Sequence, residues 1–450
     1  MSTSIEARPS VGKLSRAAFD RARRVFADGT SRATIERDPA PRYIAKGEGA
    51  YLIDLDGRRF LDLNANFTTL IHGHRFEPVI AAVSEQLQSG SCFASPTLAE
   101  IDLAELLCER VPGLDSVRFV NTGSEAVMFA IKAARAFTGR ACIAKIEGAY
   151  HGAYDWVEVS QVSAPATWGP ASDPASVPYY HGMPSSVLHE VVTLRFNAAK
   201  EAEQLIAGHA ADLAAIVIDP MPSRAGLIAP TPAFIAAVEA AARRHGVLII
   251  ADEVLNFRQA FEGASARHGL KPDIFAFGKI IGGGLPVGAV GGRSDVMSVF
   301  SADGRRPLLP QGGTFSANPL SMVAGLASMK ALDRAAFARL EALGDRLRNG
   351  LRKVIERRGA PFSVSGAGSL FRIHPRRDLP REFREAHPSA AQAEVMREMT
   401  RAFADAGIIL PFGAAACLST PMTEAEIDLV ASTFDEFLEI RTDLIEGLAT

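Results

Sequence analysis

A lysine framed by glycines is the residue of this sequence best suited to covalent chemistry. Lys279 follows the apolar run Ile274–Ala276 and precedes three glycines at 282–284. A lysine in apolar surroundings has its pKa lowered from about 10.4, and its neutral amine can form a Schiff base with a carbonyl group. The pair Gly278-Lys279 is not part of a phosphate-binding P-loop, because the pattern G-x-x-x-x-G-K-[ST] is missing. Taken alone, the segment fits a glycine hairpin with a surface lysine equally well.

Two carboxylates follow the most apolar run of the chain. Asp252 and Glu253 come directly after Val247–Ala251, and Asp252 shares a strand face with Val254 because residues two apart point the same way. A carboxylate beside an apolar surface is costly without a cation, so Asp252 needs a cationic side chain or a protonated ligand. Without further information, an aspartate that caps the next element is the favoured interpretation.

A third segment predicts a helix start with free backbone donors. Thr122 and Glu125 have the spacing of a capping box, which places Gly123 and Ser124 at the N-terminus of a helix. The N–H groups at such an end can bind a phosphate. A capped helix without any ligand is an equally good interpretation.

A glycine turn later in the chain presents one more hydroxyl group. Gln311–Gly313 is followed by Thr314, and a helix is expected to begin near Pro319. By itself this segment indicates an ordinary turn before a helix.

The scaffold that must position these residues is predicted by the hydrophobic pattern. From about Val79, short apolar β-rich runs alternate with helical segments such as Thr231–His245. This alternation indicates an α/β fold with a mostly parallel sheet, covered by helices on both sides because the runs are apolar on both faces. Ligands bind at the carboxyl ends of such strands. The predicted strands are Val117–Val120, Cys142–Ile146, Ala215–Ile218, Val247–Ala251, Ile274–Ala276 and Val287–Val290.

Two lobes are expected, because 450 residues are too many for one compact core. Residues 1–78 are predicted to form an arm and, through a hairpin at 50–63, part of a small domain. Residues 79–325 form the large domain, which carries all the segments above. Residues 326–450 form a C-terminal small domain that ends in a helix at Thr423–Leu438. Residues 160–184, rich in Ser, Pro, Ala and Tyr, are expected to form a long loop over the sheet.

Composition excludes several classes of protein. The 48 Lys and Arg against 51 Asp and Glu leave no basic excess to bind nucleic acid, and 48% apolar residues exclude a disordered chain. The N-terminus has no signal-peptide pattern, and no apolar run reaches the ~18 residues of a membrane helix. The four cysteines lack ligand-like spacing, so we expect free thiols, no metal site and a cytoplasmic protein.

In this order and at these spacings, the segments resemble the class III (ω-type) aminotransferases of pyridoxal-5′-phosphate (PLP) fold type I. The resemblance is closest to the glutamate-1-semialdehyde aminomutase-like subgroup and runs from about Gly47 into the C-terminal lobe. It implies a large domain with a mostly parallel seven-stranded sheet between helices, plus a smaller α+β domain built from both chain ends. The segments that carry it are Asn121-Thr-Gly-Ser-Glu-Ala126, Tyr150-His-Gly152, Ala251-Asp-Glu-Val254, Gly278–Gly292 and Gly313–Pro319.

The resemblance implies roles for the reacting groups. Lys279 would form a Schiff base with PLP and then carry a proton between substrate and cofactor. Asp252 would pair with the pyridinium nitrogen, which supplies the cation that its buried position requires. Val254 and Tyr150 would press on opposite faces of the ring. His151 is expected to shape this loop rather than to take part in catalysis.

The resemblance also implies a shared site. Gly123 and Ser124 would hold the phosphate of PLP at the helix N-terminus. Thr314 would reach the phosphate of the neighbouring subunit, so the expected partner is a second copy of the chain in an obligatory homodimer. No nucleic acid and no membrane partner is expected.

Two loops depart from the pattern of these relatives. Asp219-Pro220 stands where relatives usually carry Glu-Pro, and the shorter side chain could make the same local hydrogen bonds. Arg224 stands where aminomutase-like relatives often carry Asn, and it either binds the phenolic oxygen of PLP, binds a substrate carboxylate, or points outward. The loop Leu410–Cys417 lacks both the gating Glu of the aminomutases and the Arg found in some β-amino-acid aminotransferases.

Two residues near the N-terminus are candidates for substrate binding. Arg32 matches an Arg of the β-amino-acid aminotransferases and could anchor a carboxylate, with an ordinary salt bridge as the alternative. Phe67, after the hairpin, is expected to line an apolar or small pocket.

We therefore expect a PLP-dependent aminotransferase. It would move an amino group between an amino acid or amine donor and a keto acid, aldehyde or ketone acceptor by a ping-pong mechanism. The first alternative is an intramolecular aminomutase of the glutamate-1-semialdehyde type, against which the missing Glu argues. The second is a non-enzymatic or dinucleotide-binding α/β protein, which would hold no covalent cofactor.

Overall fold

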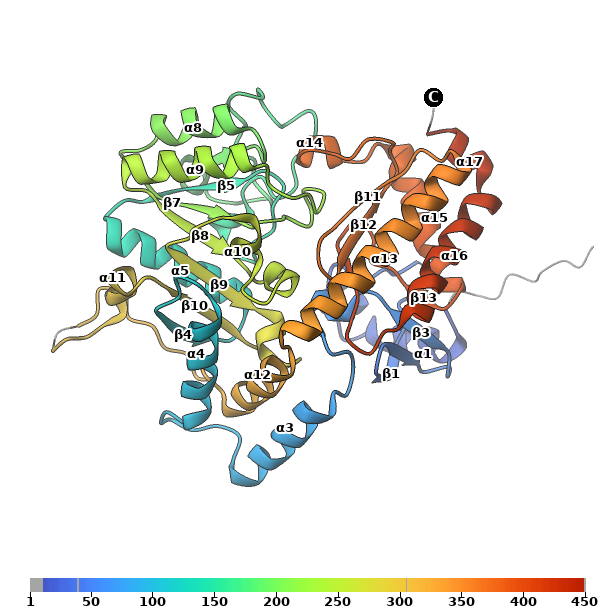
Figure 1. The fold of residues 1–450 in the computed structure, drawn as a ribbon, viewed down its shortest axis with the longest axis horizontal. Helices are drawn as coiled ribbons and strands as arrows, with labels where there is room; N and C mark the ends of the chain where they lie inside the picture. Colours follow the sequence, from blue (N-terminus) through green and yellow to red (C-terminus); the bar gives the residue numbers. More distant parts are fainter. Residues whose placement is uncertain (1–10, 39, 305, 449–450) are drawn as a thin grey trace, which may run out of the picture.

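The computed structural model describes residues 11–38, 40–304 and 306–448 and shows two lobes side by side (Figure 1). The larger lobe is built around a seven-stranded sheet of order β4-β10-β9-β8-β7-β5-β6. Only β10 is antiparallel to its neighbours, β4 and β9. The strands are Ser116–Val120 (β4), Cys142–Ile146 (β5), Val191–Leu194 (β6), Leu213–Ile218 (β7), Leu248–Asp252 (β8), Ile274–Gly278 (β9) and Gly288–Gly292 (β10).

All six predicted strands form, each displaced by no more than two residues at an end. The strand that the hydrophobic pattern did not predict is β6, a four-residue edge strand that follows the long loop. The reversed direction of β10 follows from its connection, because the few residues between β9 and β10 are too short for a parallel crossover. The α/β fold with a mostly parallel sheet is confirmed.

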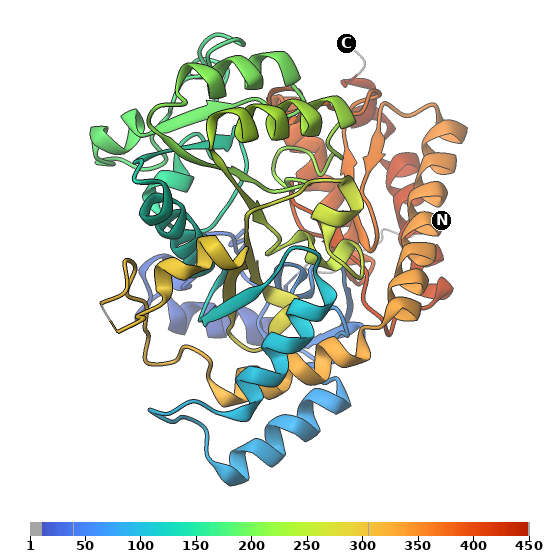
Figure 2. The same ribbon diagram turned by 60° about the vertical axis from the view of Figure 1, so that its left-hand side comes forward.

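Both faces of the sheet are buried, as the apolar strands require. Alternate residues point to opposite faces: Ile249 and Phe275 belong to one core cluster, Ile250 and Ala276 to the other. Helix α5 packs against several strands, and α8 and α9 pack together on the sheet, where Figure 2 shows them from a second side. The bounds are Gly123–Thr138 (α5), Ala199–Gly208 (α8) and Pro232–His245 (α9).

The second lobe contains segments from both ends of the chain. One sheet has the order β1-β2-β3-β13, so the predicted N-terminal hairpin pairs with a strand far along the sequence. The other has the order β11-β12-β14, and three long helices cover the lobe (Figure 1). The elements are Ile44–Glu48 (β1), Tyr51–Asp54 (β2), Arg59–Asp62 (β3), Ser363–Ser365 (β11), Leu370–His374 (β12), Ile408–Ile409 (β13), Ala416–Cys417 (β14), Arg334–Arg358 (α13), Ala390–Asp405 (α15) and Glu424–Ile440 (α16).

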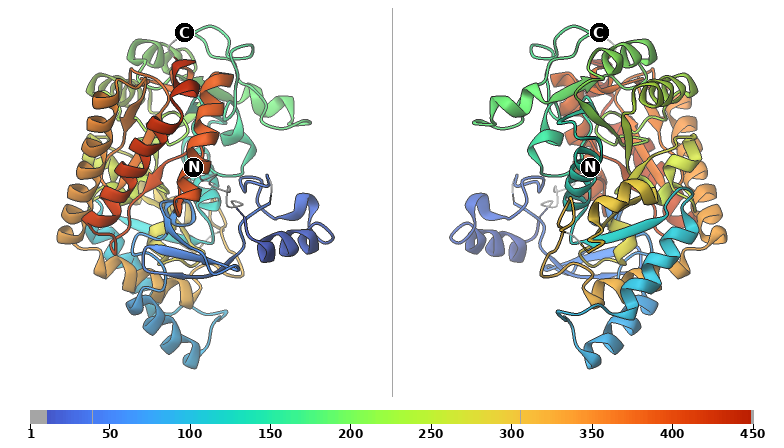
Figure 3. Two further views of the ribbon diagram at one scale, coloured as in Figure 1. Left: turned by 90° about the vertical axis from the view of Figure 1, so that its right-hand side faces the viewer. Right: turned by 90° about the vertical axis from the view of Figure 1, so that its left-hand side faces the viewer.

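Further helices extend the two lobes. Helix α1 stands off the body of the molecule in Figure 3. It is tied to the N-terminal hairpin by Asp56, which accepts hydrogen bonds from the N–H groups of Leu14 and Ser15. Residues 1–10 of the predicted arm lie outside the described residues. Helix α12 packs against α3 and α4. The bounds are Lys13–Ala22 (α1), Glu77–Ser89 (α3), Leu98–Arg110 (α4) and Pro319–Ala331 (α12).

Short helices and loops complete the chain. Residues 160–184 contain no helix or strand, as predicted. Among the helices of the described residues, none combines the length and the apolar character that a bilayer crossing requires. The short helices are Ala27–Gly29 (η1), Ala65–Thr68 (α2), Asp155–Glu158 (α6), Ser185–His189 (α7), Asn256–Gln259 (η2), Ala264–His268 (α10), Lys279–Gly282 (η3), Ser294–Met297 (α11), Ser298–Phe300 (η4), Phe383–Ala386 (α14) and Thr442–Glu446 (α17).

Candidate active site

The carboxyl ends of β4, β8 and β9 bring the predicted cofactor residues together. Asp252 is the last residue of β8, Lys279 directly follows β9, and α5 begins at Gly123 just beyond β4. A Cβ atom placed on Gly278 would lie 3.3 Å from Cγ1 of Val254 and 3.4 Å from Cα of Gly123. The three segments therefore meet at one point, where glycine allows the backbones to approach.

Lys279 is held in a conformation that a side chain seldom adopts. Its φ is +51°, in the left-handed region, which costs about 1–2 kcal/mol for a residue with a Cβ. Burial lowers the pKa of Lys279, against the charges of Asp252 and Asp219, which raise it. The lowered pKa increases the fraction of neutral amine, the form that attacks a carbonyl.

Asp252 is buried at the end of β8 with two hydrogen bonds. Its Oδ2 accepts from Nδ1 of His151 at 2.7 Å, and its Oδ1 accepts from the backbone N–H of Val254 at 3.0 Å. Within the described residues it forms no ion pair with a lysine or arginine. Helix capping, the alternative role, falls to its neighbour Glu253, which accepts from the N–H groups at the start of α10. Asp252 is thus available to a cationic ligand.

His151 lies closer to the candidate chemistry than the sequence indicated. It is buried, and burial lowers its pKa, which favours the neutral ring; the Nδ1–H of that ring can donate to Asp252. Its Nε2 is buried and has no hydrogen-bond partner within the described part of the chain. The signal was the position of His151 in the Tyr150-His-Gly152 segment, but its partner is 101 residues away along the chain.

The N-terminus of α5 faces the same loop. Oγ of Ser124 accepts from the N–H of Ala153 at 3.1 Å. The predicted cap forms in part: Thr122 accepts from the N–H of Glu125, while the Glu125 carboxylate accepts from the N–H of Asn121 instead of that of Thr122. The first N–H groups of a helix have no partner within it, so Gly123 and Ser124 retain donors for an anion.

The side chains of Tyr150 and Arg224 contact each other. Tyr150 is 47% exposed, and the guanidinium carbon of Arg224 lies 4.8 Å from the centre of its ring. Arg224 therefore turns toward Tyr150 rather than outward. Such an arginine, stacked on an aromatic ring, keeps donors for an anionic group.

Arg32 and Phe67 form a separate cluster. The Arg32 guanidinium lies 5.7 Å from the centre of the Phe67 ring, and its Nη1 donates to Oδ1 of Asn66 at 3.1 Å. No carboxylate pairs with Arg32 within the described ranges, so the ordinary salt bridge is not what the structure shows. Residues 65–68 all have positive φ, which is costly backbone geometry of a kind that clusters at functional sites.

The remaining residues singled out in the sequence are Asp219 and Thr314. Asp219 accepts from the N–H of Met221 at 2.9 Å and from Nδ2 of Asn256, a partner that the sequence did not indicate. Burial and the charge of Asp252 raise the pKa of Asp219 well above its ordinary value. Thr314 is exposed and forms no hydrogen bond with the described residues of its own chain.

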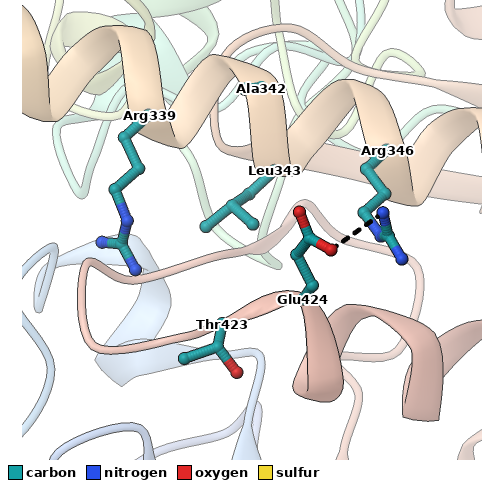
Figure 4. A pocket seen from close by; sticks show the side chains of 6 residues that line it. All are labelled: Arg339, Ala342, Leu343, Arg346, Thr423 and Glu424. Carbon is teal, nitrogen blue, oxygen red and sulfur yellow. Dashed lines mark ion pairs between the residues drawn. The ribbon is translucent and has the colours of Figure 1, made fainter.

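A surface hollow lies elsewhere, between α13 and the start of α16 (Figure 4). Its volume is about 480 Å³. Arg339 already donates to backbone carbonyls of the 420–422 segment, and Arg346 pairs with Glu424 at 3.0 Å. Because its charges are satisfied internally, this hollow does not compete with the strand ends as a ligand site. The lining residues are Arg339, Ala342, Leu343, Arg346, Thr423 and Glu424.

The fold and this arrangement of residues define a PLP enzyme of fold type I. The family model of class-III aminotransferases matches residues 33–440, and the chain belongs to this family. It is 36% identical over 405 residues to a glutamate-1-semialdehyde 2,1-aminomutase of Chloroflexus aggregans, covering 88% of this chain and 90% of the relative.

Solved structures agree with this assignment. An omega-transaminase from Sphaerobacter thermophilus superposes with a TM-score of 0.93 at 45% identity, over 95% of this chain and 98% of that one. A beta-phenylalanine aminotransferase from Variovorax paradoxus has a TM-score of 0.83 at 30% identity, over 96% and 95% of the two chains. The chain is therefore a PLP-dependent aminotransferase, as the sequence predicted.

The residues present fit PLP. A buried carboxylate without a cationic side chain suits a protonated pyridine nitrogen, and the start of α5 suits a phosphate. A Cβ on Gly123 would lie 2.6 Å from Cγ1 of Val254, so the start of α5 is closely packed against Val254. Lys279 supplies the amine at the same strand ends.

Proposed function

We propose that this aminotransferase acts between two separate molecules, one of which carries a carboxylate bound by Arg32. The single observation that carries the proposal is the Arg32 cluster: a guanidinium with no carboxylate partner among the described residues, stacked on Phe67. A guanidinium that has no carboxylate partner among the described residues and lies beside an aromatic ring suits a substrate with an acidic and an apolar end. The similarity to a beta-phenylalanine aminotransferase supports the same class of substrate, one with an acidic and an apolar end.

We also propose a role for each residue at the strand ends. PLP, when bound, withdraws electrons from the substrate carbon that bears the nitrogen. Asp252 holds the proton on the pyridine nitrogen, and His151 orients the Asp252 carboxylate by donating a hydrogen bond to it. Lys279 moves a proton at the substrate carbon, for which its lowered pKa suits it. Val254 and Tyr150 lie against the two faces of the ring.

Phosphate binding and assembly complete the proposal. Gly123 and Ser124 bind the phosphate with their N–H groups, and Thr314 reaches the site of a second copy in a homodimer. Large apolar side chains near Thr314 are exposed in the single chain: Phe315 is 60% and Leu308 76% exposed. Exposed apolar groups of this size support burial against a second copy.

The proposal on the substrate is tested with two matched amines. The first is 3-amino-3-phenylpropanoate, and the second is 1-phenylethylamine, which lacks the carboxylate. The amino-donating half-reaction, followed by the change in PLP absorbance, should favour the first amine. Arg32→Met should remove that preference and leave the rate with 1-phenylethylamine unchanged. Equal rates for both amines in the parent enzyme would overturn the role of Arg32.

An aminomutase reaction is the alternative function, supported by the aminomutase relatives. The loop Leu410–Cys417 argues against the aminomutase reaction, because the loop contains no carboxylate. Its residues Ala415 and Cys417 form hydrogen bonds with Ser223 and Asn64. The decisive experiment incubates the enzyme with glutamate 1-semialdehyde alone. Isomerisation without an added acceptor would overturn the proposed transfer between two molecules and would establish the aminomutase reaction instead.

A further inference from the structure

A buried lysine next to the candidate site has no part in the roles above. Lys145 is the fourth residue of β5 and is fully buried. Its Nζ donates to three backbone carbonyls: Ile146 at 3.0 Å, Ala149 at 3.2 Å and Val159 at 2.9 Å. An ammonium group has three N–H donors, so these carbonyls use all of them.

Two of the three carbonyls lie near the start of one segment, and the third lies at its end. Ile146 ends β5, Ala149 directly precedes Tyr150, and Val159 is where the chain returns from this excursion. Lys145 therefore closes the segment 146–159 onto itself. Buried carbonyls need partners, and the lysine supplies one to each of the three, although the Ile146 carbonyl also accepts from the N–H of Ala149 at 3.2 Å.

This segment, here called the Tyr150 loop (residues 146–159), meets the candidate site at three places. Nδ1 of His151 donates to Asp252 at 2.7 Å. The N–H of Ala153 donates to Oγ of Ser124 at 3.1 Å. The Tyr150 ring lies under the Arg224 guanidinium. One loop thus touches the carboxylate, the phosphate-binding helix start and the ring-stacking position.

We propose that Lys145 is a positioning residue: its ammonium group fixes the Tyr150 loop so that Tyr150, His151 and Ala153 hold their places around PLP. The proposal rests on the proposed function of Asp252 and Ser124, because the loop acts through them. Lys145 itself touches none of the reacting atoms.

Burial and the neighbouring charges act on the ammonium group of Lys145 in opposite directions. Burial lowers the pKa of Lys145 to about 7, and the charge of Glu147 raises it. Two other charged or titratable groups face this region: His151, and Arg384, which pairs with Glu147 at 2.7 Å. A neutral amine has two N–H groups for three carbonyls, so only the ammonium form satisfies all three.

The test compares Lys145→Met with a matched control, Arg140→Met. Nη1 of Arg140 also binds three carbonyls, of Leu213, His245 and Gly246 at 3.2, 3.1 and 3.0 Å, but just before the other end of β5. Both variants thus lose a cation that holds three carbonyls, and only Lys145 borders the site. Apo forms are titrated with PLP by absorbance, and amide exchange of residues 148–159 is measured without PLP.

We expect Lys145→Met to weaken PLP affinity by about tenfold or more, by analogy with the loss of groups that orient the ligands of a metal ion. Amides of the Tyr150 loop should exchange faster, and Arg140→Met should change neither property. Unchanged affinity and exchange in Lys145→Met would overturn the positioning role. If that variant does not fold, Lys145→Gln, which keeps two donors, is measured with the same criteria. A parent enzyme that binds no PLP would instead contradict the proposed function.

Discussion

At the scale of the residue, the hydrogen bond from His151 orients the buried carboxylate of Asp252. Asp252 is 4% exposed and has one side-chain donor, the Nδ1 of His151. A neutral histidine can donate this hydrogen bond and leave the negative charge available to a bound cation. Hydrogen bonds to charged groups contribute about 1.5–3 kcal/mol, more than those between neutral groups.

We therefore predict that His151→Ala lowers kcat/KM by about 10–100-fold, the change that corresponds to this free energy. Steady-state kinetics with a saturating acceptor measures it. His374→Ala is the control, since His374 is equally buried and bonds Ser365 at 2.8 Å in the other lobe. A loss of stability without a loss of activity is expected there. Equal activity of the two variants would show that His151 only fills space.

Candidate reactive residues could be proposed from the sequence, but their supporting partners could not. Lys279 and Asp252 stand next to apolar strands and glycines; each segment alone has a structural alternative, and only the segments together, in their order and spacing, mark these residues as candidates. His151 meets Asp252 only because β5 and β8 end at the same edge of the sheet. Lys145 looks like an ordinary strand residue, and its three carbonyls become visible only when the Tyr150 loop has folded.

At the scale of the element, the start of α5 is fitted against the segment after β8. A Cβ on Gly123 would lie 2.6 Å from Cγ1 and 2.9 Å from Cγ2 of Val254. The φ of Gly123 is not in the left-handed region, so space alone requires glycine here. Overpacking of this kind costs about 1–3 kcal/mol and shifts the neighbouring backbone.

Gly123→Ala should accordingly weaken PLP binding, because either Val254 or the first turn of α5 must move. Titration of the apo form measures the affinity. Gly350→Ala in α13 is the control: its nearest atom would be Cβ of Ala431 at 3.5 Å, and alanine there should raise stability by about 0.5–1 kcal/mol. Unchanged PLP affinity in Gly123→Ala would mean that this contact does not shape the site.

The elements themselves were predictable because the strands are short, apolar and bounded by turns. Cys142–Ile146 matches its prediction at both ends. Pairing was harder to predict: β6 is a four-residue edge strand, and β13 joins the N-terminal hairpin across more than three hundred residues. Such contacts depend on tertiary packing and leave no local pattern in the sequence.

At the scale of the whole molecule, an ion pair between Arg384 and Glu147 links the C-terminal lobe to the lobe that contains the seven-stranded sheet. Nε of Arg384, in α14, lies 2.7 Å from the fully buried Glu147 carboxylate, beside the Tyr150 loop. Burial raises the pKa of Glu147, and Arg384 opposes this shift. Removal of one partner of a buried pair leaves an uncompensated charge, which costs about 3–5 kcal/mol.

We predict that Arg384→Met destabilises the protein most at neutral pH. Without Arg384 the folded-state pKa of Glu147 rises further above its ordinary 4.5, so the deficit is complete above that raised pKa and disappears as the pH falls toward 4.5. Urea unfolding at about pH 7.5 and about pH 5 measures it. Arg381→Met, which loses the exposed pair with Glu385, should cost at most about 1 kcal/mol at either pH. A deficit independent of pH would contradict the assignment to Glu147.

The proposed sharing of sites between two copies gives a prediction that no single chain can satisfy. If Thr314 serves the partner's site, a dimer of one Lys279→Ala chain and one Thr314→Glu chain has one site with both lesions and one with neither. Each variant alone should be inactive, because one lacks the amine and the other places a negative charge near a phosphate.

Mixing the two inactive variants as unfolded chains and refolding them together should therefore restore activity. Random pairing gives half mixed dimers with one intact site each, so about a quarter of the parent activity is expected. If Thr314 instead serves its own chain, every site in the mixed dimer carries one lesion and no activity returns. Refolding each variant separately and mixing afterwards is the control, since chains that have already paired cannot form the intact site.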